Sequence, residues 1–201
     1  EALARIFHSR RQYAKAAQTW ERCIKEYGPG NDRQRALEQI TLAWGQFEPL
    51  MSQAAGKSAM VDFRFRNTKK VSFTARRVRV KELLADVVAY MRGQKEEIDW
   101  QRMNVEDIGH RLVNEGGEKY LGEQAAQWDL DLEPAEGHFD KTVTVETPMS
   151  AAGVYFLEAV VEGGNSCRII VWLNDTLIVK KPLDGKTLYY VADAVSGTPV
   201  G

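Results

Sequence analysis

Three histidines are the first residues whose chemistry has to be placed, because imidazole can serve as a metal ligand and as a general base near neutral pH. His8 falls in one helical pattern, His110 in another and His138 in a turn. Each lacks a partner at the spacing of a metal site. We therefore expect solvent-facing histidines, with no metal ligand and no catalytic residue among them.

Acidic residues in the second half of the chain are dense enough to raise the question of calcium. They are Asp129, Asp131, Glu133, Glu136 and Asp140. The first three occupy every second position of a strand pattern, whereas a calcium loop has turn glycines among its ligands. The spacing favours a solvated strand face that can pair with basic residues across neighbouring strands. The candidates for this pairing are Arg64, Arg66 and Arg76.

Nucleophiles and phosphate loops are not indicated by any motif. No serine stands in a Gly-x-Ser-x-Gly elbow, and Gly116-Gly117 lacks the lysine and second glycine spacing of a phosphate loop. Cys23 and Cys167 occur in segments of different character, which favours two buried thiols over a metal knuckle or a disulfide framework. The sequence predicts a protein that is not an enzyme and needs no cofactor.

Charge does not favour nucleic acid as a partner, since 27 basic residues are balanced by 28 acidic ones. A basic run does occur from Lys69 to Lys81, but single-strand binding also needs aromatic platforms. The nearby Phe63, Phe65 and Phe73 alternate with polar residues and are expected on a buried face. No apolar run is long enough to insert into a membrane, and any signal peptide would lie outside this chain.

Elements with a helical period open the chain. Apolar residues recur at steps of three and four over residues 2–27, with a break expected near Ser9. A Gly-Pro-Gly turn ends this pattern and a second helix comes after it. The sequence of residues 13–22 is similar to a tetratricopeptide (TPR) helix, in which small residues let neighbouring helices approach. Residues 1–43 are therefore predicted to form a TPR-like helical hairpin.

The period then changes from 3.6 to 2. Residues 61–66 and 71–76 alternate apolar and polar side chains, as strands with one buried face do. The phase slips at Arg76-Arg77, which predicts a β-bulge. Later short strands are separated by turn residues in the pattern of a sandwich. Residues 155–161 and 169–172 are apolar on both faces and are expected in central strands or beneath helices.

A helical period returns between residues 81 and 127 and predicts a helical insertion. One stripe comprises Leu83, Leu84, Val87, Val88 and Met91, and a second comprises Val105, Ile108 and Leu112. The expected fold class is α+β: an antiparallel, immunoglobulin-like β-sandwich with this insertion, preceded by the helical hairpin. The sandwich is expected over 44–185. Residues 186–201 are expected to begin a following β domain, which indicates a piece of a longer chain.

Several short motifs occur in order from residue 47 onwards. They are Phe65-Arg66-Asn67 before a polar turn, a tryptophan strand at 128–132, a strand at 152–157 after a proline loop, a junction at 177–180, and a final Asp-x-x-Ser-Gly-x-Pro-Val turn at 193–200. Their order resembles the N-terminal macroglobulin-type domains of bacterial alpha-2-macroglobulin-like proteins. The resemblance implies a macroglobulin-type sandwich.

Members of that family are protease traps: a bait segment is cleaved, the molecule rearranges and, in many members, a thioester of a Cys-Gly-Glu-Gln motif captures the protease. This chain has Leu121-Gly122-Glu123-Gln124 inside the expected helical insertion. Because leucine supplies no sulfur, we interpret the match as coincidence. The resemblance implies a non-catalytic structural module exported to the periplasm or cell surface. Its partners would be the remaining domains of the parent chain and, through the full-length protein, proteases.

A second interpretation comes from the helical part of the chain. Residues 1–43 could bind a peptide or a component of the cell envelope while the sandwich presents them. The chain would then be an adaptor for protein-protein or envelope interactions.

Overall fold

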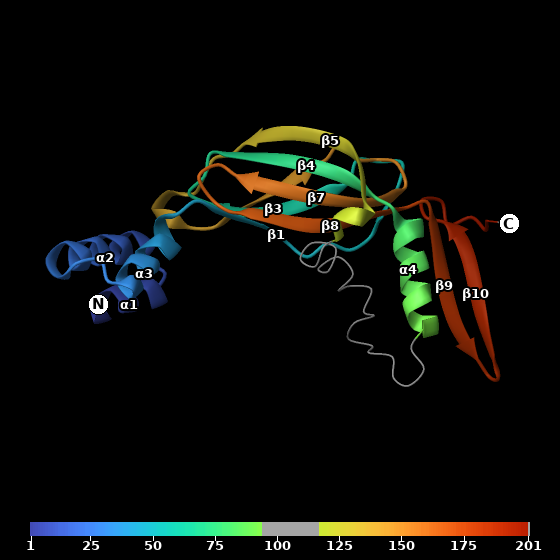
Figure 1. The fold of residues 1–201 in the computed structure, drawn as a ribbon, viewed down its shortest axis with the longest axis horizontal. Helices are drawn as coiled ribbons and strands as arrows, with labels where there is room; N and C mark the ends of the chain where they lie inside the picture. The colour runs from blue at the N-terminus through green and yellow to red at the C-terminus, as the bar shows by residue number, and fades with distance from the viewer. Residues whose placement is uncertain (94–116, 201) are drawn as a thin grey trace.

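The computed structural model describes residues 1–93 and 117–200. In chain order its elements are α1 (Ala2–Ser9), α2 (Tyr13–Tyr27), α3 (Asn31–Thr41), β1 (Trp44–Phe47), β2 (Gln53–Ala54), β3 (Met60–Arg66), β4 (Lys70–Val78), α4 (Val80–Gly93), η1 (Gly117–Tyr120), β5 (Leu121–Asp131), η2 (Glu136–His138), β6 (Lys141–Glu146), β7 (Gly153–Val161), β8 (Ser166–Asn174), β9 (Thr176–Leu183) and β10 (Lys186–Asp193). The helical annex (α1 to α3) and the terminal hairpin (β9 and β10) lie at opposite ends of a β-sandwich (Figure 1).

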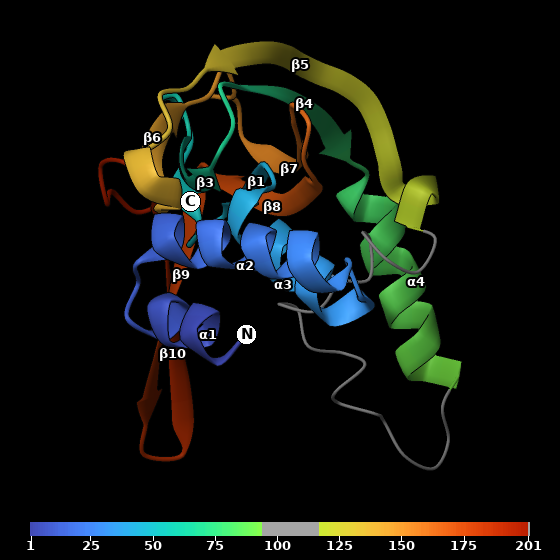
Figure 2. The same cartoon turned by 90° about the vertical axis from the view of Figure 1, so that its left-hand side faces the viewer.

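The helical annex has three helices within residues 1–43, all of which the structure describes. The break expected near Ser9 is confirmed, because α1 ends there and Arg11 turns the chain with a positive φ of 56°. The expected two-helix hairpin is therefore a three-helix unit. Trp20 and Ala16 of α2 are buried in its core together with Ile40 of α3. Seen from this end of the molecule, the three helices lie in front of the sandwich (Figure 2).

The sandwich is built from two sheets of described strands. One has the order β1-β3-β6 and the other the order β2-β8-β7-β4-β5. Every neighbouring pair is antiparallel except β2 with β8. Phe63, Phe65 and Phe73 are almost completely buried between the sheets, as their alternation predicts, and Leu157 of the central strand β7 joins them. The predicted α+β class with an antiparallel sandwich is confirmed.

The predicted bulge lies in β4. Its register against β5 shifts between Ala75 and Arg76 and again between Arg76 and Val78. Beyond the shift, Val78 is buried in a second apolar cluster with Leu83 of α4 and Phe156 of β7. The bulge thus redirects the strand so that its last apolar residue meets α4. The first outward-facing apolar residues of β7, Val154 and Phe156, are buried in this same cluster.

The helical insertion is shorter than the expected range of 81–127. Helix α4 covers Val80–Gly93, whereas Leu121 to Gln127 belong to β5. Strand β5 pairs with β4 from Lys70 opposite Asp131 to Val78 opposite Leu121, so a long-range ladder fixes this segment. The second expected stripe, at 105–112, lies outside the described residues.

The strand pairing groups β9 differently from the expected division at residue 186. Among the described strands, β9 pairs with β10 and not with the sandwich. Asp184 and Gly185 join the two strands as a two-residue turn, with Gly185 at a φ of 65°. A turn of this type closes a tight hairpin and pairs the strands on either side of it.

Candidate functional site

The two histidines in the described part of the chain lie in different elements, α1 and η2. His8 is exposed on α1, His138 ends η2, and His110 lies outside the described residues. Within residues 1–93 and 117–200, no group of three histidine, cysteine or acidic side chains could hold a metal ion.

The strand carboxylates have partners other than those expected. Asp129 accepts hydrogen bonds from Lys70 Nζ and Ser72 Oγ, both at 2.7 Å, and these bonds hold the pKa of Asp129 below its usual value. The three arginines proposed to pair with this face bond elsewhere. Arg64 lies 3.1 Å from Glu48, Arg66 lies 3.3 Å from Asp140, and Arg76 donates to the Gly122 carbonyl oxygen at 3.0 Å.

The Leu121-Gly122-Glu123-Gln124 match lies at the start of β5 rather than in a helix. Leu121 is buried with the apolar cluster under α4, while Glu123 and Gln124 are exposed. Two arginines of the basic run between residues 69 and 81 also have partners within the fold: Arg77 lies over the ring of Tyr155 at 5.2 Å, and Arg79 pairs with Glu82 at 3.6 Å. Neither feature forms a reactive site.

The annex is fastened to the sandwich by side chains at the end of β3. Arg66 Nη2 donates to the Gln39 carbonyl oxygen at 2.7 Å. Asn67 Nδ2 donates to the carbonyl oxygens of Ile40 and Leu42 at 2.7 and 3.2 Å. The last carbonyls of a helix have no partner within it. The sandwich therefore supplies the C-terminal cap of α3, and we call this contact the junction.

The junction continues onto the segment around η2. His138 Nδ1 lies 2.9 Å from Asn67 Oδ1 and must donate, because an amide oxygen only accepts. Next to it, the rings of Tyr13 and Phe139 meet edge to face with their centroids 5.1 Å apart. Asn67 and His138 have positive φ angles of 54° and 66°, a conformation that is uncommon outside glycine. Such residues persist where the surroundings determine them, which identifies the junction as a specified contact.

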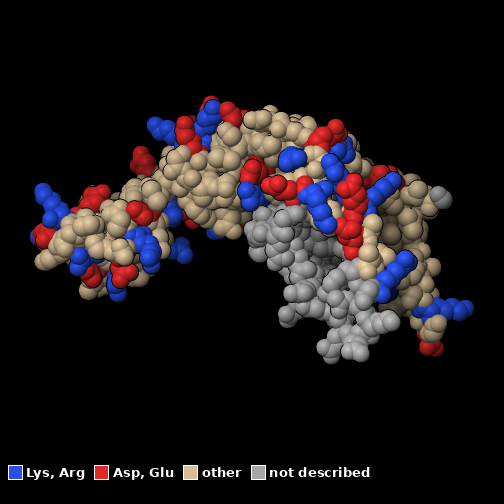
Figure 3. Space-filling model, in the orientation of Figure 1, with Lys and Arg blue, Asp and Glu red and all other residues tan. Residues whose placement is uncertain are grey.

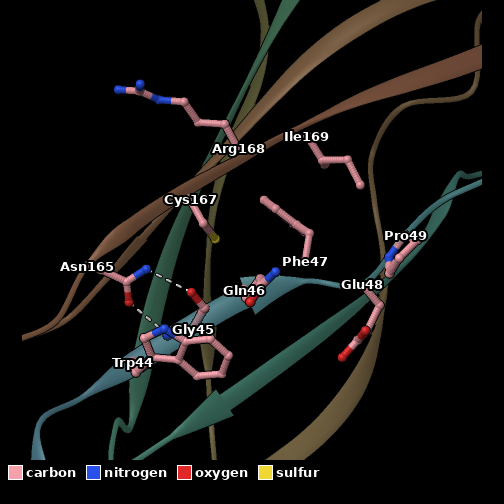
Figure 4. A pocket seen from close by; sticks show the side chains of 10 residues that line it. All are labelled: Trp44, Gly45, Gln46, Phe47, Glu48, Pro49, Asn165, Cys167, Arg168 and Ile169. Carbon is pink, nitrogen blue, oxygen red and sulfur yellow. Dashed lines mark hydrogen bonds between the residues drawn. The ribbon is translucent and has the colours of Figure 1, made fainter. Parts of the chain in front are cut away.

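A groove of about 390 Å³ opens between β1 and β8 at an edge of the sandwich. Figure 4 shows its lining side chains, with those of Phe47 and Cys167 close together. The charged residues at its rim have partners in the sandwich: Arg168 pairs with Glu158 at 2.7 Å and Glu48 with Arg64 at 3.1 Å. The lining of the groove is about equally polar and apolar.

Asn165 closes one end of this groove. Its Oδ1 accepts from the Gly45 N–H at 2.9 Å and its Nδ2 donates to the Gly45 carbonyl oxygen at 2.8 Å (Figure 4). One side-chain amide thus supplies the two hydrogen bonds that a paired strand would make to the outer edge of β1. The two sheets are thereby joined at a corner where no backbone ladder connects the described strands.

Replacing Asn165 with alanine is expected to lower the free energy of unfolding by about 1–3 kcal/mol, because two half-buried backbone groups of Gly45 lose their partner. Urea denaturation followed by tryptophan fluorescence measures the change. The exposed neighbour Ser166 offers a control, since Ser166→Ala removes a polar group that faces solvent. Equal effects of the two substitutions would show that water replaces the amide without loss.

Cys167 is a free thiol with an unfavourable setting for reaction. Burial raises the pKa of Cys167 to about 11, although a hydrogen bond from the backbone N–H of Phe47 opposes the shift. In a Cys23→Ser background we expect iodoacetamide at pH 8 to alkylate Cys167 about a hundredfold more slowly than an ordinary thiol, because only the thiolate reacts. The rate should rise with pH towards 11 and become ordinary in denaturant. Fast alkylation of the folded protein at pH 8 would contradict this assignment.

A smaller groove of about 250 Å³ lies on the helical annex. Residues from all three helices line it: Arg5, His8 and Ser9 of α1, Trp20 of α2, and Asp32, Ala36 and Gln39 of α3. Trp20 is buried and the surrounding residues are mostly polar. If the chain is an adaptor, this groove is where its helical part would bind a partner.

On the face seen in Figure 3, basic and acidic residues are interspersed. This face therefore does not favour the approach of a large charged ligand. Interspersed charges produce little long-range field. Among the described helices, none combines the length and the apolar character needed to cross a membrane.

Comparison with known proteins finds similarity in structure alone. No protein-family model matches the sequence, and no curated protein matches it. Among solved structures, native alpha-2-macroglobulin from Escherichia coli, in a piece spanning domains MG0-NIE-MG1, has a similar fold. The TM-score is 0.52 at 15% identity, covering 79% of this chain and 48% of that chain. The expected resemblance to bacterial alpha-2-macroglobulin is confirmed at the level of the fold, and this chain spans about half of the matched piece.

Two further structures are less similar. A piece of the same Escherichia coli protein spanning NIE-MG1 gives a TM-score of 0.49 at 13% identity, covering 80% of this chain and 74% of that chain. Red sea bream transglutaminase gives 0.36 at 9% identity, covering 82% of this chain and 23% of that chain. Both TM-scores lie below 0.5.

Proposed function

We propose that this chain is a non-catalytic structural module of an exported alpha-2-macroglobulin-like protein that traps proteases. The observation that carries the proposal is the fold, which over 79% of the chain is similar to a piece of Escherichia coli alpha-2-macroglobulin. The ordered motifs between residues 47 and 200 support it independently of the fold.

A module of this kind acts through its shape. The sandwich has a core of interlocked rings, with the Phe63 centroid 5.4 Å from that of Phe47 and 5.6 Å from that of Phe73. It holds the annex at one end through the junction and the terminal hairpin at the other (Figure 1). Its partners would be the remaining domains of the parent chain, and a protease would meet the module only through the assembled protein.

The side chains that could react are engaged in structural roles. Burial raises the pKa of Cys167, and His138 donates its Nδ1 proton to Asn67. A leucine stands where a thioester would need cysteine. We therefore expect the chain by itself neither to cleave a substrate nor to capture a protease covalently.

The test compares the 201-residue chain with the full-length gene product. Each is incubated with trypsin, chymotrypsin and subtilisin, and residual activity is measured on a large protein and on a small peptide. We expect no effect of the chain alone, and loss of activity on the large substrate with the full-length product, because a trapped protease is shielded sterically. Inhibition or covalent capture by the chain alone would contradict the structural role. A full-length product without effect on any protease would contradict the trap.

Export is the second part of the proposal. Fractionation of the native host should place the full-length product in the periplasm or at the cell surface. Recovery from the cytoplasmic fraction, with marker proteins correctly distributed, would contradict it.

The groove on the annex supports a second candidate function, an adaptor that binds a peptide or an envelope component through residues 1–43. Reversing the charge at Arg5, which lines the groove, should then abolish capture of a partner from host envelope extract. Lys25 is exposed on α2 and does not line the groove, so Lys25→Glu is the matched control. Equal capture by both variants and the unmodified chain would argue against this function.

A further inference from the structure

The terminal hairpin is the most exposed apolar surface of the described chain. Every residue of β9 is exposed, and only the end of β10 is covered. Apolar side chains project from both faces: Ile178 and Tyr189 are 66% and 59% exposed on one, and Val179 and Leu188 are 50% and 51% exposed on the other. A two-stranded hairpin is at best marginally stable in water. It therefore needs further strands, and the question is at which edge.

The hydrogen-bond alternation identifies the groups that each edge offers. Ala194 N donates to the Asp175 carbonyl oxygen at 2.8 Å, which fixes the phase of the ladder. In an antiparallel pair, every second residue turns its N–H and carbonyl away from the partner strand. With the observed register, these are Thr176, Ile178, Lys180 and Pro182 on β9, and Thr187, Tyr189, Val191 and Asp193 on β10.

The outer edge of β9 is poorly suited to another strand. Pro182 is one of its outward-facing residues, and proline has no N–H to donate. Prolines in sheets are confined to edges for this reason. The adjacent Lys180 and Lys181 place charge along the same strand, a common device against edge pairing. Strand β9 is therefore suited to remain an edge strand, with no further strand on its outer side.

The outer edge of β10 has already begun to pair. After β10 the chain turns back through a loop in which Asp193 Oδ1 accepts from the N–H groups of Val195 and Ser196 at 3.0 and 2.7 Å. Asp193 N then donates to the Thr198 carbonyl oxygen at 2.9 Å, and Val200 N donates to the Val191 carbonyl oxygen at 3.1 Å. This is an antiparallel start with Pro199 opposite Ala192. Continued in the same register, the next residues would reach Tyr189 and then Thr187.

We infer that β9 and β10 are the first two strands of a further sheet with β9 at its edge, and that its third strand is the segment encoded directly after Gly201, paired antiparallel to β10 in the register that Val200 begins. The inference rests on the proposed function only in assuming a multidomain parent. Beyond the proposed function, the inference gives the strand order of the new sheet: β9, then β10, then the third strand. It also assigns β9 to that sheet rather than to the sandwich.

The test is hydrogen exchange measured by NMR on the 201-residue chain and on the full-length gene product. In the shorter chain, the amides of Thr187 and Tyr189 on β10 and of Ile178 and Lys180 on β9 should all exchange rapidly. In the longer product, Thr187 and Tyr189 should become protected by at least about a hundredfold, because a bonded amide exchanges only on local opening. Ile178 and Lys180 should stay unprotected.

Two proline variants of the longer product provide a second readout. Tyr189→Pro removes an N–H that the third strand needs and should lower the melting temperature, whereas Lys180→Pro removes an N–H from the open edge and should not. Protection at Ile178 and Lys180 instead, protection at neither edge, or a gene that ends at Gly201 would overturn the inference. Exchange is measured without protease, so a protected β10 edge in a product that traps nothing would refute the proposed function and leave this strand order intact.

Discussion

Replacing Phe63 with alanine should lower the free energy of unfolding by about 3–5 kcal/mol, the range for a large aromatic ring removed from a packed core. The side chain is completely buried, and its ring packs against those of Phe47, Phe65 and Phe73. Both sheets of the sandwich contribute to this cluster, so the loss should appear as one cooperative transition in urea denaturation.

Gly45 makes the Phe63 prediction specific to this fold. A Cβ at Gly45 would meet the Phe63 ring and would lie 2.8 Å from Val161 Cγ2. Gly45→Ala alone should therefore cost about 1–3 kcal/mol through overpacking. In the Phe63→Ala background the added methyl enters vacated space, so its cost should be clearly smaller and the two effects non-additive.

The control for this cycle is the neighbour of Gly45 on the exposed face of β1. Gln46→Ala should be within about 0.5 kcal/mol of neutral in both backgrounds, as is usual for surface positions. Additive effects of Gly45→Ala and Phe63→Ala would mean that the chain relaxes around the new methyl without using the space of the ring.

The core of the sandwich could be predicted from the sequence because burial on a strand is a local pattern. Phe63 and Phe65 occupy alternate positions of β3 and both face inward. The bulge in β4 was equally accessible, since a slip in phase within one strand moves the later residues of that strand to the opposite face. At these positions, the alternation in the sequence is enough to predict which side chains are buried.

Strand β5 shows where local pattern fails. Its first residues, from Leu121 to Gln127, are rich in alanine, glutamine and glutamate, which favour helix over strand. They form a strand because β4 offers an edge to pair with, and that edge is distant in sequence. The sequence holds no signal for this pairing, so the helical insertion was extended too far.

The partner of strand β9 was not predicted, for a different reason. Its alternation is genuine, but alternation does not say which strand is the partner. The Asp184-Gly185 turn is a signal that could have decided the question, since two residues of this type pair the strands that flank them. The junction had no comparable signal. Asn67 and His138 lie 71 residues apart, and only the fold brings them together.

Asn67→Ala should release the annex from the sandwich. The amide of Asn67 caps two carbonyls at the end of α3 and accepts from His138, and loss of such a partner costs about 1–3 kcal/mol at a partly buried site. Alanine must also adopt the positive φ of 54°, which adds about 1–2 kcal/mol of backbone strain. The sandwich core is untouched, so the loss should fall on docking rather than on global folding.

The measurement is ¹⁵N relaxation, in which residues of α2 should tumble with the sandwich in the unmodified chain and faster than it in Asn67→Ala. Asn67→Gly separates the two causes, because glycine accepts the positive φ and lacks the amide. We expect Asn67→Gly to undock the annex less than alanine does but clearly more than Lys69→Ala, a control at an exposed position of the same turn. If the annex stayed docked in Asn67→Gly, Arg66 and the contact between Tyr13 and Phe139 would suffice to hold it. The amide of Asn67 would then cap α3 without positioning the annex.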